Sequence, residues 1–302
     1  MREVCEAVIT IPCWAPEPEP SFELWDLARR YCSAVRRAYN ILSKDRKAEK
    51  EAYEAANDYL NNSHYAEAAI WEASWVLKAQ KEAAKARISW LKADIKRLRK
   101  LEERTKDPLK LKGIRRGIEE RERELEELLE KGFKRAVFGS RRRARRLQKG
   151  RLSLKAWRRS RKGKIFSRGR RRDKGNRNIR VVERKGKFHL KVRYVPLHGR
   201  NKWIELPLIV PDKYKEALRS ALRTSDPYDV RMVRKKGGWR VFISFRVHYT
   251  VKPREGLIAG MDINSDNLAV AIASEDGRFV ASRLFKDEKL VERGVRSEER
   301  KR

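Results

Sequence analysis

Hydrophobic and polar positions divide the chain into a helical half and a strand-rich half. Residues 3–11 alternate loosely between apolar and polar side chains and predict one strand. Prolines between Pro12 and Pro20 then predict a break in regular structure. From Trp25 to Leu42 apolar residues recur three and four positions apart, which predicts a helix with Ser21 as its N-cap.

Further helices are predicted before residue 132. Helical spacing continues over residues 44–60 and 64–103, and the second of these stretches would extend about 60 Å as a helix. Asp107-Pro108 ends it, because proline disfavours helical backbone in the residue before it. Leu109–Glu130 predicts a partner helix, and the short connection predicts an antiparallel helical hairpin with a structural or recognition role.

After residue 177 the apolar period becomes two, as in half-buried strands. Strands are predicted over residues 178–183, 187–195, 203–210, 229–233 and 239–248, with a short helix over 212–222. Several short strands at this spacing favour a small β-barrel.

The stretch Gly256–Phe279 predicts a β-hairpin with apolar strands and a polar turn over residues 264–267, and Arg278–Phe285 predicts a third strand. Asp262 lies inside the first apolar strand. A lone carboxylate is costly to bury unless a cation binds it, and a metal ion is the simplest such partner. The alternative is a plain hairpin in which Asp262 faces solvent.

Charge changes this picture, because Lys and Arg number 77 against 42 Asp and Glu, a net charge of +35. Residues 134–174 alone hold 20 Lys or Arg and one acid, Asp173. Such an excess is most often neutralised by nucleic acid, with an anionic membrane surface as the other candidate. No apolar stretch approaches the roughly 20 residues that span a bilayer, and the start does not resemble a signal peptide, so we expect no membrane partner.

The order of small, apolar and basic residues in this segment argues against a disordered tail. Phe138, Trp157 and Phe166 interleave with the cations, so each either stacks on bases or anchors the segment to the core. Trp157 is the stacking candidate. The candidate nucleic-acid-binding residues are Arg141, Arg142, Arg143, Arg145, Arg146, Lys149, Arg158, Arg159, Arg161, Lys162, Arg168, Arg170, Arg171 and Arg172.

Cys5, Cys13 and Cys32 are too few and too irregularly spaced for a disulfide framework and fit a cytoplasmic chain. The four histidines show no ligand spacing, so no zinc site is expected within residues 1–302.

Three stretches resemble one known family. The strand G-x-D-x-N at residues 260–264, its polar turn, the Leu-Ala-Val strand and the D-G turn resemble the first acidic motif of RuvC-like, RNase H-fold nucleases, in particular the TnpB/OrfB family. The stretch FGSRRRARRLQKGRLSLKAWRRSRKGKIFSRG resembles a basic segment of the same family, and CSAVRRAYN resembles its first recognition-lobe helix.

The resemblance implies an α+β multidomain fold: a split oligonucleotide-binding-like β-barrel with an inserted helical lobe, followed by the start of an RNase H/RuvC-like fold. The implied parts are residues 1–15 (first barrel strand), 21–132 (helical recognition lobe), 133–176 (basic segment), 177–255 (rest of the barrel) and 256–302 (incomplete nuclease domain).

The family's members are Mg²⁺-dependent, RNA-guided DNA endonucleases associated with transposons, so the implied partners are guide RNA and target DNA. Asp262 would be the first of three catalytic, metal-binding carboxylates. The other two acidic motifs are absent before Arg302, so we expect a truncated or interrupted member that binds nucleic acid without cutting it. Alternatives are a catalytically inactive remnant or regulator, and a basic RNA-binding or chromatin-like protein whose acidic hairpin is incidental.

Overall fold

The computed structural model describes residues 3–286 apart from 18, 20, 133–135, 174, 225, 252–255 and 264–266. Residues 8–247 form one compact unit, and residues 1–7 with 248–302 form another. The secondary structure is α+β, with several antiparallel sheets.

The larger unit begins with helices that follow the predicted apolar spacing. They are α1 (Phe22–Lys44), α2 (Glu49–Leu60), α3 (Ser63–Arg104) and α4 (Pro108–Lys131). Ser21 Oγ accepts the Leu24 amide hydrogen at 3.1 Å, so the predicted N-cap is confirmed. The helix predicted over residues 44–60 is present but begins later, at Glu49, because Lys44 is the last residue of α1.

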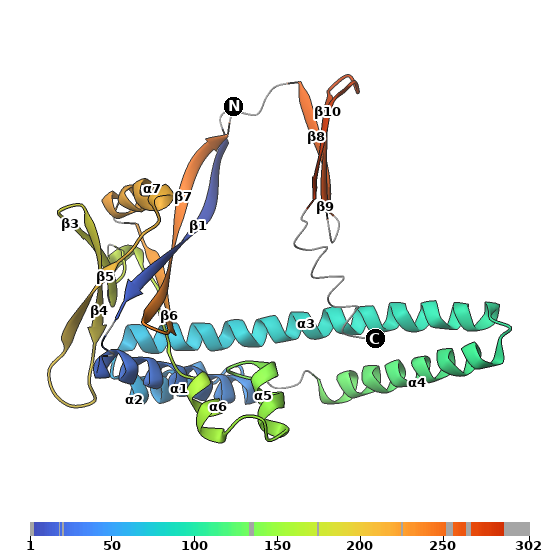
Figure 1. Ribbon diagram of the computed structural model, residues 1–302, viewed down its shortest axis with the longest axis horizontal. Helices are drawn as coiled ribbons and strands as arrows, with labels where there is room; N and C mark the ends of the chain where they lie inside the picture. Colours follow the sequence, from blue (N-terminus) through green and yellow to red (C-terminus); the bar gives the residue numbers. More distant parts are fainter. Residues whose placement is uncertain are drawn as a thin grey trace. The chain divides into compact units, whose positions relative to one another are not determined.

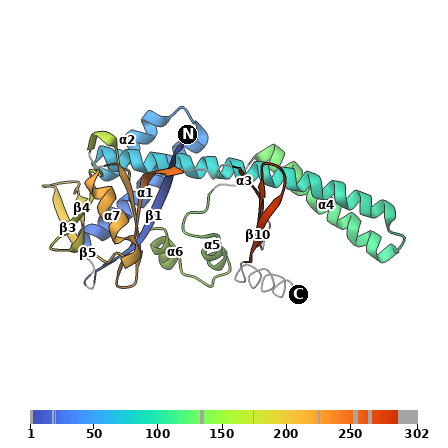
Figure 2. The same ribbon diagram turned by 90° about the horizontal axis from the view of Figure 1, so that it is seen from above.

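Helices α3 and α4 form the predicted antiparallel hairpin and lie side by side in two views (Figures 1 and 2). Pro108 occupies the first turn of α4, where its missing amide hydrogen costs nothing. A small core of Ile95, Leu98 and Ile118 holds the pair together. Its charged faces pair with each other, as in Arg87–Glu124 at 2.7 Å.

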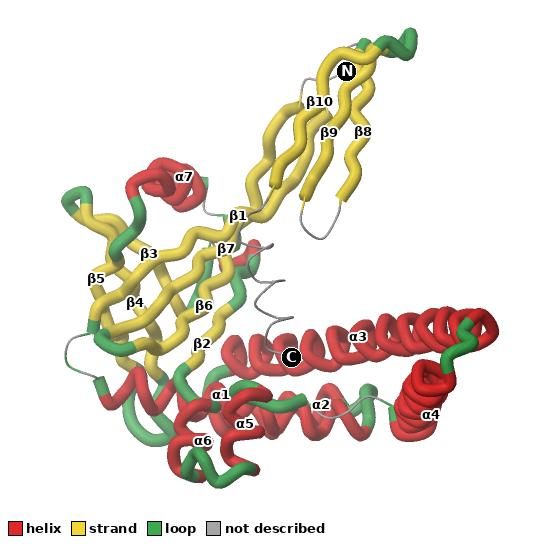
Figure 3. The backbone as a smooth tube through the Cα atoms, turned by 45° about the vertical axis from the view of Figure 1, so that its right-hand side comes forward, coloured by secondary structure: helices red, strands yellow, loops and turns green. Residues whose placement is uncertain are grey.

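The strands of this unit form two sheets, and no sheet closes into a barrel among the described strands (Figure 3). The first has the order β1-β7-β6-β2, and the second has the order β3-β4-β5. The bounds are β1 Glu3–Pro16, β2 Lys164–Ser167, β3 Ile179–Arg184, β4 Lys187–Tyr194, β5 Lys202–Leu208, β6 Tyr228–Lys235 and β7 Gly238–Val251. Helix α7 (Asp212–Arg223) connects β5 to β6.

The predicted break at Pro12 is wrong, because β1 continues through it to Pro16. The Trp14 amide donates to the Ile209 carbonyl at 3.0 Å, on the side of β1 away from β7. Amide hydrogens of alternate residues point to the same edge of a strand, so Pro12 lacks its donor on that outer edge. Edge strands tolerate proline for this reason.

One buried cluster joins both sheets to α1, α2 and the first turns of α3. It includes Tyr31, Tyr65, Leu190 and Trp239, all 0% exposed. The helices therefore fix the position of the segment between α4 and β3, which carries most of the candidate residues.

The smaller unit contains a three-stranded antiparallel sheet with the order β10-β9-β8. Its strands are β8 (Leu257–Ile263), β9 (Asn267–Ser274) and β10 (Phe279–Lys286), which confirms the predicted hairpin and third strand. The predicted turn over residues 264–267 lies largely outside the described residues. Among the helices that the structure describes, none has the length and apolar composition to cross a membrane.

Candidate nucleic-acid interface

Two short basic helices follow the helical hairpin, α5 (Arg141–Gln148) and α6 (Leu154–Ser160), which lie close together (Figure 1). A serine caps each helix: Ser140 Oγ accepts the Arg143 amide hydrogen at 3.2 Å, and Ser153 Oγ accepts that of Ala156 at 3.2 Å. Part of the stretch that composition marks as cationic is therefore helical, in agreement with the argument against a disordered tail.

The cations on these helices are exposed to solvent. Exposed side chains are Arg141, Arg142, Arg143, Arg145, Arg146, Lys149, Arg158 and Arg159. Within the part of the chain that the structure describes, none of them makes an ion pair with an acidic group. Helix α3 and helix α4 differ sharply, because Arg99, Arg115 and Arg116 there each pair with a glutamate within 3.1 Å.

The later candidate cations are tied to the fold. The Arg161 carbonyl accepts a hydrogen bond from Arg36 at 2.9 Å, and Lys162 is half-buried. The Arg168 guanidinium lies 4.6 Å from the Trp71 ring centroid, and Arg170 pairs with Glu67. Arg172 Nε lies 3.9 Å from Asp173 Oδ1, and Arg171 is exposed. Part of this charge is therefore neutralised by the protein itself.

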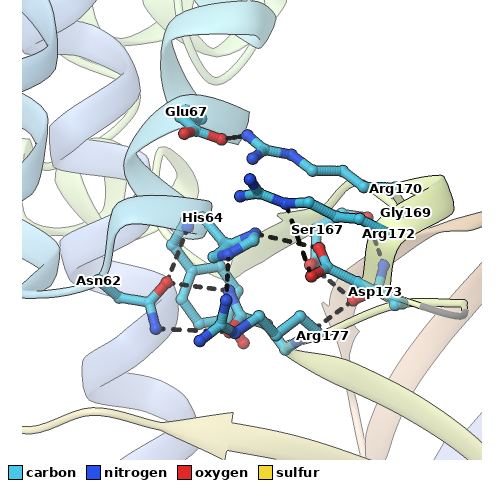
Figure 4. Close-up of polar contacts among 12 residues, drawn as sticks. Asn62, His64, Glu67, Ser167, Gly169, Arg170, Arg172, Asp173 and Arg177 are labelled. Atoms are coloured by element: carbon cyan, nitrogen blue, oxygen red, sulfur yellow. Dashed lines mark hydrogen bonds and ion pairs between the residues drawn. The ribbon is translucent and has the colours of Figure 1, made fainter.

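A buried histidine that spacing alone did not mark fixes the end of the basic segment against α3 (Figure 4). His64 Nδ1 lies 3.6 Å from Asp173 Oδ2, and His64 Nε2 lies 3.0 Å from an Arg177 guanidinium nitrogen. Burial lowers the pKa of His64 most, Arg170, Arg177 and Arg172 lower it further, and Asp173 opposes them. We call His64, Asp173 and Arg177 the His64 cluster.

Hydrogen bonds from asparagine side chains also hold the end of the basic segment in place. Asn62 Oδ1 accepts the Tyr65 amide hydrogen at 2.9 Å and so caps α3, and it also accepts a hydrogen bond from Asn178 Nδ2 at 3.0 Å. Asn176 Nδ2 donates to the carbonyls of Ser167 and Tyr228, both at 3.0 Å. The basic segment is thus held by side chains whose partners lie far away in sequence, which explains why periodicity did not reveal them.

The three aromatic residues of the segment have different surroundings. Phe166 is buried and stacks on Trp71 with ring centroids 5.5 Å apart, and Phe138 meets Tyr39 edge-on at 5.2 Å. These two residues anchor the segment to the core. Trp157 is half-buried and has the Arg161 guanidinium 5.5 Å from its ring centroid. Its assignment as a base-stacking residue stays a prediction.

Asp262 lies on β8, opposite Ala269 of β9, and its side chain is exposed. The prediction of a buried carboxylate is therefore wrong, and the alternative hairpin with a solvent-facing aspartate matches this exposure. Small neighbours such as Gly260, Ala269 and Ala271 leave a hollow of about 380 Å³ that Asp262 helps to line.

A Mg²⁺ site of the kind that the resemblance implies requires several converging carboxylates. No group of three or more His, Cys, Asp or Glu side chains gathers in a metal-binding arrangement anywhere among the described residues. The catalytic and metal-binding roles of Asp262 stay predictions from the resemblance.

Residues 8–256 match the family model described as the SSO2105 N-terminal domain. The chain belongs to this family. The match contains the α5 and α6 helices and the His64 cluster, whereas Asp262 lies beyond it. No curated protein matches the chain.

Proposed function

We propose that this SSO2105 N-terminal domain protein binds nucleic acid through α5 and α6. We further propose that it is the amino-terminal part of a TnpB-like, transposase-associated RNA-guided DNA endonuclease that binds guide RNA and target DNA. The observation that carries the first proposal is the contrast between exposed arginines without carboxylates on α5 and the self-paired arginines of α3 and α4.

That contrast matters because the positive charge of an arginine without a carboxylate partner is not offset by the protein and can attract an anionic ligand. A phosphate backbone releases condensed counterions when Lys or Arg side chains replace them, so it favours a dense and unneutralised cluster. Arg142, Arg145 and Arg146 are exposed on two turns of one capped helix, which holds them close together without help from a ligand. An ordered surface of this kind loses less conformational entropy on binding than a disordered basic tail.

The TnpB-like assignment rests on the resemblance and on element order. A strand precedes the helical region, the basic helices follow it, more strands come next, and the hairpin with Asp262 comes last. Strands β1 and β7 are neighbours in one sheet although the helices separate them in sequence, which supports a helical lobe inserted into a split β-domain. The oligonucleotide-binding-like and RuvC-like folds remain part of this proposal, as does Mg²⁺ as the cofactor of the family.

A catalytically inactive RNA- or DNA-binding remnant is the second candidate function. The exposure of Asp262 favours it, since the described residues gather no metal-binding group around this carboxylate. A basic RNA-binding protein with an incidental acidic hairpin would also have an exposed Asp262 that binds no metal. Both alternatives keep the nucleic-acid interface on α5 and α6.

The test is the salt dependence of RNA binding by the triple variant Arg142→Ala, Arg145→Ala, Arg146→Ala. Alanine is a strong helix former, so the substitutions leave α5 helical. We expect the slope of log affinity against log salt to fall by about 0.7 to 0.9 for each phosphate that the variant no longer binds. The matched control is Arg99→Ala, Arg115→Ala, Arg116→Ala, which also removes three exposed helical arginines but ones already paired with glutamates.

An unchanged slope in the α5 variant would show that these arginines do not touch phosphate. A control variant that lowers the slope as much as the α5 variant would show that overall charge, not the α5 surface, governs binding. Structured RNA and duplex DNA are compared in the same assay, because the proposal includes both as partners.

A further inference from the structure

The outward face of the sheet β3-β4-β5 carries an exposed aromatic ring among cations, away from α5 and α6. Residues on a strand alternate between faces, and the register is regular. Val181, Leu190 and Leu206 face the core. The opposite face therefore carries Arg180 on β3, Lys191 and Arg193 on β4, and Trp203 on β5.

We propose that Trp203 stacks on an unpaired base of a bound single strand and that this sheet face is a second nucleic-acid contact. The inference rests on the proposed nucleic-acid-binding function and adds the site that reads a single-stranded part of the ligand.

The geometry keeps the indole available. Trp203 is 42% exposed, and the Arg180 guanidinium lies 5.1 Å from its ring centroid. A cation above a ring occupies one of its two faces and holds the ring against the sheet. Arg193 is the register partner of Trp203 on β4, so cations lie on neighbouring strands beside the ring.

The charge on this face exceeds what its one acidic residue can neutralise. Glu205 is shared by Arg184 at 3.0 Å, His189 at 3.3 Å and Lys191 at 3.8 Å. Arg180 and Arg193 make no ion pair with any acid among the described residues. An aromatic ring beside cations that lack a carboxylate fits a base next to backbone phosphates, and such rings bind single strands with little sequence preference.

The experiment compares Trp203→Ala with Trp90→Ala in the full chain, using a labelled oligouridine of about 20 nucleotides and a duplex of the same length as probes. Trp90 is the matched control: it is 47% exposed and has the Arg87 guanidinium 4.3 Å from its ring centroid. Arg87 is paired with Glu124 at 2.7 Å, so the cation that contacts the Trp90 ring is already neutralised.

We expect Trp203→Ala to weaken oligouridine binding about 5- to 150-fold, with an unchanged salt slope and little effect on the duplex. Trp203→Phe keeps a ring that can stack and should lose less than Trp203→Ala. Trp90→Ala should bind as the unaltered protein does. Thermal unfolding of each variant checks that the sheet is intact.

Wild-type affinity in Trp203→Ala, while the α5 triple variant is weakened, would overturn the inference and leave the proposed function standing. Equal losses for single strand and duplex would also overturn it, because stacking on an unpaired base cannot weaken a duplex. Failure of the unaltered protein to bind either probe would overturn both proposals. Trp203-dependent binding to anionic vesicles without an effect on RNA would assign this face to a membrane and overturn the inference.

Discussion

The indole nitrogen of Trp239 donates a hydrogen bond to Glu17 Oε2 at 2.8 Å, between residues 222 positions apart. Glu17 Oε1 accepts the Ser21 amide hydrogen at 3.0 Å, just before α1 begins, and an Arg234 guanidinium nitrogen lies 3.6 Å from Oε2. Trp239 is 0% exposed and Glu17 is 5% exposed. One carboxylate thus joins the end of β1 to the hairpin formed by β6 and β7.

Glu17→Ala should lower the free energy of unfolding by about 2 to 4 kcal/mol, because it leaves a buried indole N–H and a partly buried guanidinium unpaired. Glu17→Gln keeps an acceptor and should cost less. Urea denaturation measures both. The exposed Glu19→Ala serves as the control and should unfold like the unaltered protein. Equal midpoints for Glu17→Ala and Glu19→Ala would contradict the role of this carboxylate.

Gly169→Ala should be strongly destabilising. A Cβ at this position would lie 2.4 Å from the Tyr228 nitrogen and 2.7 Å from the Gly175 oxygen, both backbone atoms that cannot move aside alone. We expect a loss of about 3 kcal/mol or more, together with a weakened hydrogen bond from the Gly169 amide to Asp229. The midpoint of urea unfolding reports the loss, and a midpoint close to that of the unaltered protein would disprove the crowding.

Gly113→Ala should stabilise the protein, in contrast to Gly169→Ala. Gly113 lies within α4, and a Cβ there would meet nothing within 4 Å. Replacing an exposed helical glycine by alanine stabilises a helix by about 0.5 to 1 kcal/mol. A rise in the unfolding midpoint is the expected result, whereas a fall would show that residue 113 is not in a regular helix.

The stability of the larger unit should decrease as pH falls below about 6.5, partly through His64. The fold lowers the pKa of His64, so the unfolded chain takes up this proton first and the neutral form contributes stability above the unfolded pKa. That contribution is lost as pH falls from about 6.5 toward the folded pKa. His64→Gln should therefore reduce the difference in unfolding midpoint between about pH 7.5 and pH 5.5.

The exposed His198 provides the control for this measurement. His198→Gln removes an imidazole that is not buried and so controls for the loss of a histidine side chain as such. If both glutamine variants change the pH dependence equally, the burial of His64 does not account for it.

Residues 1–302 should show no Mg²⁺-dependent cleavage of single- or double-stranded DNA. Asp262 is exposed, and the described residues gather no metal-binding group around it. Asp262→Ala should then behave like the unaltered protein in a nuclease assay with labelled substrate. Turnover that needs Mg²⁺ and disappears in Asp262→Ala would refute this expectation and would establish the catalytic role that the resemblance implies.

Sequence reasoning predicted the elements with strong local signals. The hairpin α3–α4 follows from its apolar spacing and from Pro108, and β8 and β9 follow from apolar runs flanked by turn residues. Strand β2 was missed because its few residues lie among cations, and pairing with β6 rather than local pattern makes it a strand.

The location of the candidate site could be predicted from charge, but the side chains that pair with its cations could not. The density of arginine in α5 is visible in the sequence, whereas the neutralisation of Arg170 by Glu67 depends on the packing of α3 against the basic segment. The exposure of Asp262 was one of two open alternatives, because an apolar run does not reveal whether another layer covers it. Trp203 gave no signal of its own, since its surroundings come from β3 and β4.

The adjacency of β1 and β7 has a consequence for synthesis on the ribosome. Strand β1 leaves the exit tunnel roughly 220 residues before its neighbour, a delay of roughly 10 to 45 s at ordinary translation rates. During that interval an extended segment with open edges could pair with other nascent chains. Pro12 withholds one donor from such an edge, and proline on an edge strand disfavours pairing with another chain.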